Sequence, residues 1–209
     1  MTTVIIPAKS FARAKSRLQP ALDGPSRAAL ARRLFEHVLD VARAVDGTDV
    51  LVVTDGDDVE ATARPRGIRC VRDPGEPPLR LAVDLGLEVA RSKGQGAALV
   101  LMADLPWVTE ADVVALVSAL DRADVVVGPD TRRLGTNALA LRPGVSMPTA
   151  FGRDDSFREH LARAEALGLR AHVHESPSVA FDVDTPADLR AMTVLTGRRA
   201  ARSGSVDPG

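Results

Sequence analysis

Residues 97–106 read Ala-Ala-Leu-Val-Leu-Met-Ala-Asp-Leu-Pro, and this stretch decides the fold class. The apolar run from Ala97 to Met102 predicts a strand buried on both faces, as in a parallel sheet covered by helices. Asp104 follows this strand almost directly. Ligands of an open α/β sheet lie beyond the carboxyl ends of its strands, so Asp104 is well placed for a ligand. The alternative is a turn or a helix cap, although the next helix is expected to start only near Thr109.

Other short apolar runs on both sides of this strand alternate with segments of helical periodicity. Strands are predicted at residues 3–6, 49–53, 68–71, 125–127, 137–141 and 169–174. Helices are predicted at residues 26–45, 57–64, 79–92, 109–120, 155–166 and 186–195. The expected N-caps of the first and fourth of these are Ser26 and Thr109, the latter with Asp112 three residues on. This order predicts an α/β fold, a three-layer α/β/α sandwich with a mostly parallel sheet. The broken alternation after residue 128 indicates an inserted or antiparallel portion.

The size of the chain, 209 residues, fits one domain, which we expect at residues 1–197. Residues 198–209 have no apolar pattern and are expected to form a disordered tail. No apolar run approaches the roughly 20 residues needed to span a bilayer, and the N-terminal apolar run is too short for a signal peptide. We therefore expect a cytoplasmic protein without a membrane partner.

Charge and composition exclude several classes of partner. The formal net charge of -1 gives no basic footprint for nonspecific nucleic-acid binding. Aromatic residues make up only 3% of the chain, which argues against a surface that stacks bases. The single Cys70 excludes an intramolecular disulfide and a cysteine-rich zinc site. Nucleic acid is therefore not an expected partner.

A cationic loop follows the first predicted strand. It reads Pro7-Ala8-Lys9-Ser10-Phe11-Ala12-Arg13-Ala14-Lys15-Ser16-Arg17-Leu18. Backbone amides combined with cations suit a polyphosphate, although the loop has neither a Walker nor a Gly-x-Gly-x-x-Gly pattern. Only 3 of the 27 basic residues are lysines, and Lys9 and Lys15 lie in this loop, where a compact cation is useful. The alternative is an ordinary solvated basic loop.

Two aspartates precede the last predicted helix. Asp182 and Asp184 alternate in an extended segment, so their side chains point to one side. Neighbouring carboxylates repel each other unless a cation lies between them, and Mg²⁺ prefers oxygen ligands. The alternative is a helix cap. We expect both, with Thr185 and Asp188 structural and the other two aspartates available for a metal.

A third polar group lies between these segments. Thr136 and Asn137 stand where a strand begins, and Gly152 shortly precedes a helix capped by Asp155 or Ser156. A helix N-terminus beside a glycine suits an anionic group. The alternative is a capped surface helix.

Together these segments resemble the guanylyltransferases of coenzyme F420 biosynthesis. That family lies within the nucleotidyltransferases of glycosyltransferase-A-like fold, which include the molybdopterin guanylyltransferases. The likeness covers about residues 3–195. It rests on the first loop, Asp104-Leu105-Pro106, Gly135-Thr136-Asn137-Ala138-Leu139, Phe151-Gly152 through Ser156-Phe157 and His160, and Asp182-Val183-Asp184-Thr185-Pro186.

The resemblance implies transfer of GMP from GTP to phosphoenolpyruvate, giving enolpyruvoyl-2-diphospho-5′-guanosine and pyrophosphate. The acceptor in archaeal relatives is 2-phospho-L-lactate; the arginine-rich composition resembles that of a GC-rich genome and favours phosphoenolpyruvate. By position, the resemblance assigns Lys15 and Asp104 to catalysis. It assigns nucleotide binding to Pro7, Ala8, Lys9, Lys15 and Arg17, acceptor binding to Thr136, Gly152 and Ser156, and Mg²⁺ to Asp104, Asp182 and Asp184.

One departure concerns the nucleotide. Relatives usually carry Gly-Leu-Asn near the start of the helix after the third strand, where residues 73–80 read Asp-Pro-Gly-Glu-Pro-Pro-Leu-Arg. The alternatives are another nucleotidyltransferase of this fold, a phosphoacceptor receiver domain and a degenerate non-catalytic relative. The first usually has a glycine-rich first loop and the second an acidic pair there, and this chain has neither. Whether the chain forms a homodimer stays open.

Overall fold

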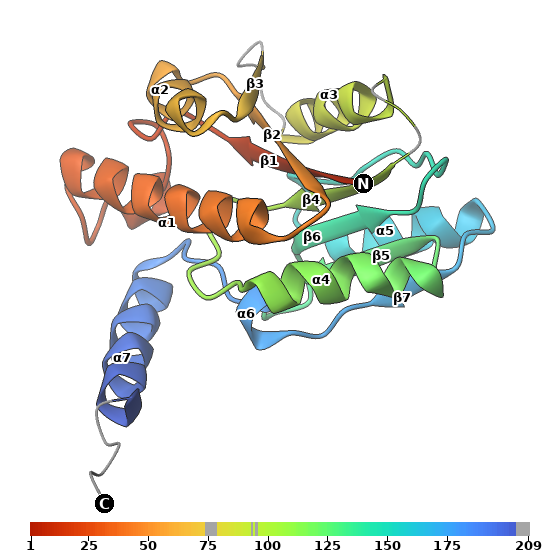
Figure 1. Ribbon diagram of the computed structural model, residues 1–209. Coiled ribbons are helices and arrows are strands. Elements are labelled where there is room, and N and C mark those ends of the chain that lie inside the picture. The colour runs from red at the N-terminus through yellow and green to blue at the C-terminus, as the bar shows by residue number, and fades with distance from the viewer. Residues whose placement is uncertain (74–78, 93, 95, 204–209) are drawn as a thin grey trace, which may run out of the picture.

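The fold is built on one mixed β-sheet. The computed structural model describes residues 1–73, 79–92, 94 and 96–203, with backbone alone from residue 195 (Figure 1). The strands are β1 Thr2–Ala8, β2 Thr48–Thr54, β3 Arg69–Arg72, β4 Ala97–Leu101, β5 Val125–Pro129, β6 Thr136–Leu141 and β7 Ala171–Val173. Their order in the sheet is β3-β2-β1-β4-β6-β5-β7, and β6 runs antiparallel to β4 and β5 while the other pairs are parallel. The mostly parallel sheet and its antiparallel portion after residue 128 are confirmed.

Helices cover both faces of this sheet, as the three-layer prediction requires (Figure 1). One face packs against α1, α2, α4 and the short α6, and the other packs against α3 and α5. The helices are α1 Gly24–Ala44, α2 Asp57–Ala63, α3 Leu79–Ser92, α4 Glu110–Ser118, α5 Ser156–Ala166, α6 Pro177–Ala180 and α7 Pro186–Ser203. Three single-turn 3₁₀ helices cover Ser16–Leu18, Arg64–Arg66 and Ala119–Asp121.

The central strand β4 shows why the opening stretch decides the fold. Every residue of β4 is buried, because one face of the strand meets α1 and α4 and the other meets α3. Strand β1 lies parallel beside it, with Ile5 opposite Val100. The carboxyl ends of β1 and β4 therefore lie together, and the loops that follow them meet.

The helix caps differ in one place from those expected. Thr109 caps α4, and Asp112 returns the hydrogen bond to the Thr109 backbone N–H, which makes a complete capping box. Helix α1 begins at Gly24, before the expected Ser26. Its cap is Asp23, which accepts a hydrogen bond from the Ser26 backbone N–H. Pro25 lies in the first turn, where the backbone N–H that proline lacks would have no partner within the helix.

Helix α7 leads away from the sheet (Figure 1). Its Leu189 and Met192 pack against the small apolar cluster of Leu18, Leu30, Leu34 and Val183, which fixes the start of the helix beneath the first loop. The helix extends to Ser203, into the segment expected to be a tail, while residues 204–209 lie outside the described residues. Within the described residues, no helix combines the length and apolar character needed to cross a membrane.

Candidate active site

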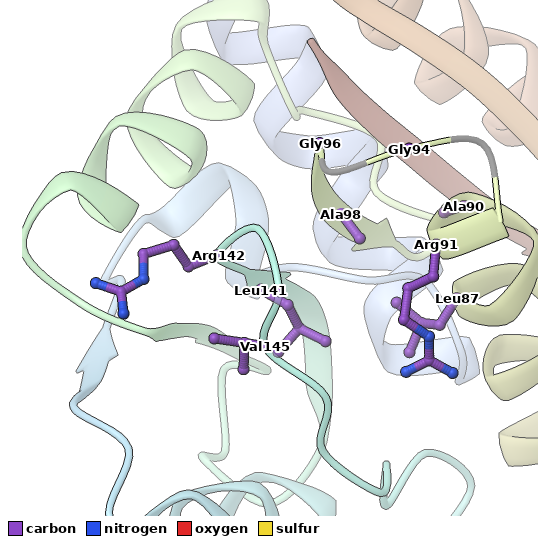
Figure 2. Close-up of a pocket in the computed structure, with 10 residues that line it drawn as sticks. Leu87, Ala90, Arg91, Gly94, Gly96, Ala98, Leu141, Arg142 and Val145 are labelled. Carbon is purple, nitrogen blue, oxygen red and sulfur yellow. The ribbon is translucent and has the colours of Figure 1, made fainter.

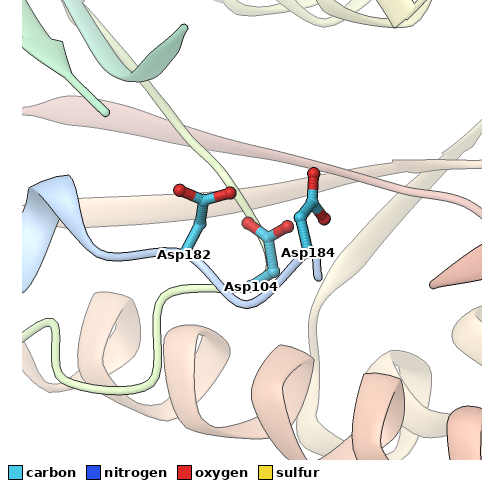
Figure 3. A group of neighbouring side chains, drawn as sticks. All are labelled: Asp104, Asp182 and Asp184. Atoms are coloured by element: carbon cyan, nitrogen blue, oxygen red, sulfur yellow. The ribbon is translucent and has the colours of Figure 1, made fainter. Parts of the chain in front are cut away.

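Three carboxylates form the centre of the site. Asp104 follows β4, and Asp182 and Asp184 lie in the extended segment before α7; one oxygen of each lies within 4.8 Å of the others. Figure 3 shows the three side chains grouped and pointing the same way. Between the two aspartates Val183 is fully buried, so their shared orientation follows from the strand-like alternation. The sequence-predicted metal residues are thus brought together.

The acidic triad fits a divalent cation. Asp104 Oδ1 is buried and has no hydrogen-bond partner among the described residues. Burial, reinforced by the charges of Asp104 and Asp184, raises the pKa of Asp182 to about 7. The site is therefore short of positive charge, and hard divalent cations favour a set of oxygen ligands such as this one.

Lys15 supplies part of that positive charge. Its Nζ lies 2.6 Å from Asp104 Oδ2 and 3.0 Å from Asp184 Oδ1, and its side chain is only 8% exposed. Burial opposes the charged form, but the two carboxylates outweigh it and raise the pKa of Lys15. Lys15 also has a left-handed backbone (φ 57°), which a non-glycine residue adopts at a cost of order 1–3 kcal/mol. Such strain is typical of functional positions.

The first loop is held by the turn after β2. Asp55 accepts a hydrogen bond from the Ser10 N–H at 3.0 Å, and Asp58 accepts one from the Phe11 N–H at 2.8 Å. Gly56 permits this approach, because a Cβ there would lie 2.6 Å from the Ser10 Cα. Two backbone amides that seemed available for phosphate are therefore already used. The role of these aspartates was not predicted, although they also follow a strand at the ligand-binding edge.

The nucleotide-binding residues expected from the sequence line one pocket of about 500 Å³. Pro7, Ala8, Lys9, Lys15 and Arg17 all contribute to its wall, together with Asp104, Asp184 and Gly152. Arg17 is largely exposed, and its guanidinium lies 3.7 Å from Asp184. The pocket therefore joins the cationic loop to the acidic triad. Residues 74–78, where the expected Gly-Leu-Asn is replaced, lie outside the described residues.

A β-bulge separates Thr136 from Asn137. On β5 Gly128 opposes Ala138 and Pro129 opposes Thr136, so β6 carries one extra residue. The bulge breaks the alternation of side chains. Asn137 consequently lies on the same face as Ala138, toward α6, and its amide donates to Val179 O at 3.0 Å and Asp182 Oδ1 at 3.4 Å, while Thr136 faces α5. The contact between Asn137 and the acidic triad was not predicted.

The three residues expected to bind the acceptor differ in exposure. Gly152 is exposed on the pocket wall with a left-handed backbone (φ 83°) that favours glycine, whereas Thr136 and Ser156 are 6% and 3% exposed. Ser156 Oγ donates to Thr136 Oγ1 at 3.3 Å, and His160 Nδ1 lies 3.0 Å from the same oxygen. Ser156 begins α5, and Asp155, at the cap position, makes no side-chain capping hydrogen bond.

A second cavity, of about 210 Å³, lies at the opposite end of the strands (Figure 2). Its wall is mainly apolar, with Leu87, Leu141 and Val145 beside two arginines. Arg91 donates to Ser146 Oγ at 2.8 Å and Arg142 pairs with Asp124 at 2.6 Å, so both guanidiniums are engaged. The residues that line this cavity include no carboxylate, whereas the acidic triad lies at the other end of the strands.

Comparison with known proteins defines the class first. A nucleotidyl transferase of known structure from Methanothermobacter thermautotrophicus has a TM-score of 0.64 and 18% identity to this chain, with 95% of this chain and 99% of that chain covered. The fold is thus that of the nucleotidyltransferases, and an acidic triad able to hold a metal lies at its ligand-binding edge.

The chain belongs to the family described as guanylyl transferase CofC like, whose model matches residues 2–202. A phosphoenolpyruvate guanylyltransferase from Sphaerobacter thermophilus is 39% identical over 92% of this chain and 93% of the relative. A 2-phospho-L-lactate guanylyltransferase from Methanothermobacter thermautotrophicus is 35% identical over 90% of this chain and 82% of the relative. The family expected from the sequence motifs is confirmed.

Proposed function

We propose that this protein transfers GMP from GTP to phosphoenolpyruvate, with release of pyrophosphate. The observation that carries the proposal is the place of Lys15, which bridges Asp104 and Asp184 on the wall of the pocket that the cationic loop also lines. A nucleoside triphosphate with its bound cation needs positive side chains for the phosphates and carboxylates for the cation in one place. This pocket brings them together.

The nucleotide lies over the first loop in this proposal. Pro7 and Ala8 face the base or the ribose, and Lys9, Lys15 and Arg17 face the triphosphate. The exposure of Lys9 and Arg17 on the pocket wall supports a role in binding, because their charges are accessible to a ligand. Lys15, whose raised pKa keeps it protonated, is suited to a fixed charge beside the leaving pyrophosphate.

Asp104, Asp182 and Asp184 would hold Mg²⁺, which when bound neutralises phosphate charge and orients the reacting groups. The unpaired Asp104 Oδ1 supports this assignment, since a buried carboxylate oxygen without a donor is poorly satisfied. Asn137 orients Asp182 through its amide, at 3.4 Å from Oδ1. Lys15 partly compensates the charge of the aspartates before ligands arrive.

The reaction requires positioning more than proton transfer. A phosphate oxygen of the acceptor attacks the α-phosphorus of GTP in line. The new bond joins that oxygen to the α-phosphorus, and the bond from the α-phosphorus to the bridging oxygen of pyrophosphate breaks. Because the attacking oxygen is already anionic, no general base is required, and catalysis depends on orientation and charge neutralisation.

The acceptor lies beside Gly152, with Thr136 and Ser156 behind it. The hydroxyl pair and the start of α5 suit an anionic group. The relative from Methanothermobacter supports 2-phospho-L-lactate as a second candidate, which has a saturated, methyl-bearing carbon where phosphoenolpyruvate has a carbon–carbon double bond. Both substrates are soluble metabolites, which supports the cytoplasm as the location.

Product analysis tests the proposal. Purified protein is incubated with Mg²⁺, GTP and one acceptor at a time, namely phosphoenolpyruvate, 2-phospho-L-lactate or 3-phospho-D-glycerate, and the products are identified by mass spectrometry. We expect the guanosine diphosphate conjugate of phosphoenolpyruvate to form fastest. Faster conversion of another acceptor would replace phosphoenolpyruvate as the substrate. Absence of any conjugate, with ATP, CTP and UTP also tried, would favour a degenerate binding protein.

A further inference from the structure

His160 is a fully buried histidine whose two ring nitrogens contact different elements. Its Nε2 accepts a hydrogen bond from the Ala150 backbone N–H at 2.8 Å. Its Nδ1 lies 3.0 Å from Thr136 Oγ1. The ring also packs edge-on against Phe151, with the centroids 4.9 Å apart. His160 therefore connects β6 to the loop that carries Gly152 on the pocket wall.

The backbone contact fixes the tautomer of this histidine. The Ala150 N–H can only donate, so Nε2 is the unprotonated nitrogen and Nδ1 carries the hydrogen. Burial, together with the charge of Arg163, lowers the pKa of His160 to about 4, so the ring is neutral at pH 7. The Nδ1–H group accordingly donates to the Thr136 hydroxyl oxygen, and the Ser156 backbone carbonyl is a further hydrogen-bond partner of the ring.

The Thr136 hydroxyl is thereby turned into a donor. Its oxygen accepts from His160 Nδ1 and from Ser156 Oγ, which uses both lone pairs. The hydroxyl hydrogen must then go to a third group, and no acceptor for it is found among the described residues. The β-bulge at Thr136 and Asn137 directs this hydroxyl toward the α5 face, where Gly152 opens onto the pocket.

We infer that His160 is a positioning residue for the acceptor: it forces Thr136 to donate its hydroxyl hydrogen to an anionic oxygen of a small phosphorylated carboxylic acid and holds the Gly152 loop beside it. This inference rests on the proposed function for the identity of the acceptor. It assigns His160 no contact with substrate. Its effect passes entirely through Thr136 and the Ala150 backbone.

Two substitutions of His160 separate its two contacts. In His160→Gln the side-chain amide reaches the place of Nε2 and its oxygen can accept from Ala150, but the donor to Thr136 is lost. In His160→Asn the amide NH₂ lies near the place of Nδ1 and can still donate to Thr136, but the contact with Ala150 is lost. A second pair of variants tests the hydroxyl of Thr136: Thr136→Val removes it, and Thr136→Ser keeps it.

Steady-state kinetics with GTP and the acceptor form the first test. We expect His160→Gln and Thr136→Val each to raise the KM for the acceptor about tenfold, the scale of one lost hydrogen bond, and to change the KM for GTP less than about twofold. Thr136→Ser should keep a near-normal acceptor KM, and His160→Asn should be less impaired than His160→Gln. In the double variant that combines His160→Gln with Thr136→Val, the KM for the acceptor should be little higher than in Thr136→Val alone.

Additive effects in the double variant, or equal rises in both KM values, would overturn the inference and leave a structural histidine. An inactive wild-type enzyme with every nucleotide and acceptor would instead contradict the proposed function. Wild-type activity combined with additive variants would contradict the positioning role alone. The two failures are therefore distinguishable.

Nitrogen-15 NMR of histidine-labelled wild-type protein gives a test that does not depend on the variants folding. We expect His160 to show the Nδ1–H tautomer at pH 7. Addition of phosphoenolpyruvate should shift its Nδ1 resonance, because the Thr136 oxygen becomes polarised when its hydrogen is donated to the ligand. An Nε2–H tautomer, or an Nδ1 resonance that phosphoenolpyruvate leaves unchanged at saturation, would overturn the inference.

Discussion

Lys15 Nζ and Asp104 Oδ2 lie 2.6 Å apart, so the loop after β1 and the end of β4 are joined by an ion pair whose side chains are 8% and 18% exposed. The two residues stand 89 positions apart in the chain. The parallel pairing of β1 and β4 brings them together. Removing one partner of a pair this enclosed strongly destabilises the folded protein, because the remaining buried charge then lacks compensation.

Replacing the lysine tests its place in the reaction. We expect Lys15→Met to lower kcat/KM for pyrophosphate release at least ~10²-fold, the scale of losing one key electrostatic group. Lys15→Arg should recover little, because a planar guanidinium does not replace a compact ammonium between two carboxylates. Arg43→Met, which removes an exposed cation near the end of α1, is the matched control and should be near normal. Comparable activity of Lys15→Met and Arg43→Met would refute the role of Lys15.

The aspartates of the triad should be equally sensitive. Asp104→Asn and Asp184→Asn keep the shape of the side chain but lose its charge, and each should lower turnover at least ~10²-fold. Asp121→Asn, in an exposed turn after α4, serves as the control. The readout is acceptor-dependent pyrophosphate release over a series of Mg²⁺ concentrations. Near-normal turnover in either triad variant would remove the metal assignment.

Asp182 should show opposite effects on stability and activity. Its raised pKa means that the folded state holds a proton more tightly than the unfolded state, so this residue lowers stability as pH rises from about 4 to about 7. Asp182→Asn should therefore raise the free energy of unfolding of metal-free protein by about 3 kcal/mol at pH 8, and by little at pH 4. The turnover of Asp182→Asn should nevertheless be lower than that of the wild-type protein.

Urea unfolding of wild-type and Asp182→Asn protein in EDTA, at both pH values, measures this difference. Asp121→Asn again provides the comparison for an exposed aspartate. A variant that is no more stable than wild type at pH 8 would show that the charged Asp182 is not destabilised by burial and by the neighbouring carboxylates in the folded protein.

The anchoring of the first loop predicts a selective defect in nucleotide binding. Asp58 accepts from the Phe11 N–H and the Ser10 hydroxyl, whereas the neighbouring Asp57 is exposed and pairs with Arg72. We expect Asp58→Asn to raise the KM for GTP about tenfold by weakening charge-assisted hydrogen bonds. Asp57→Asn should leave it within about twofold. Equal KM values for the two variants would mean that the loop does not need this anchor.

The fold was largely predictable because its strands carry local signals. The apolar run at residues 97–102 matches β4, and the capping box at Thr109 marks α4 within one residue. Helix α6 was missed because its four residues, Pro177–Ala180, are too short to show a helical period. The cap of α1 was misplaced because Ser26 and Asp23 are both good capping residues, and only the hydrogen bond distinguishes them.

The carboxylates of the site could be predicted from the sequence, but the contacts that its side chains make could not. Alternation placed Asp182 and Asp184 on one side, and the family resemblance joined Asp104 to them. The bridge from Lys15 to two of these carboxylates depends on the path of a whole loop. Which face Thr136 and Asn137 each take depends on a bulge in the pairing of β5 and β6, which leaves no local signal in the sequence. Regular alternation from Ala138 would place Asn137 on the α5 face and Thr136 on the α6 face.

Pyrophosphate release by the wild-type protein tests the central claim most directly. The protein is supplied with Mg²⁺ and GTP, with and without phosphoenolpyruvate, and the same pair of reactions is run with ATP, CTP and UTP. The account predicts release with GTP that depends on phosphoenolpyruvate and is abolished by EDTA. Release that needs no acceptor, or that is as fast with another nucleotide as with GTP, would contradict it.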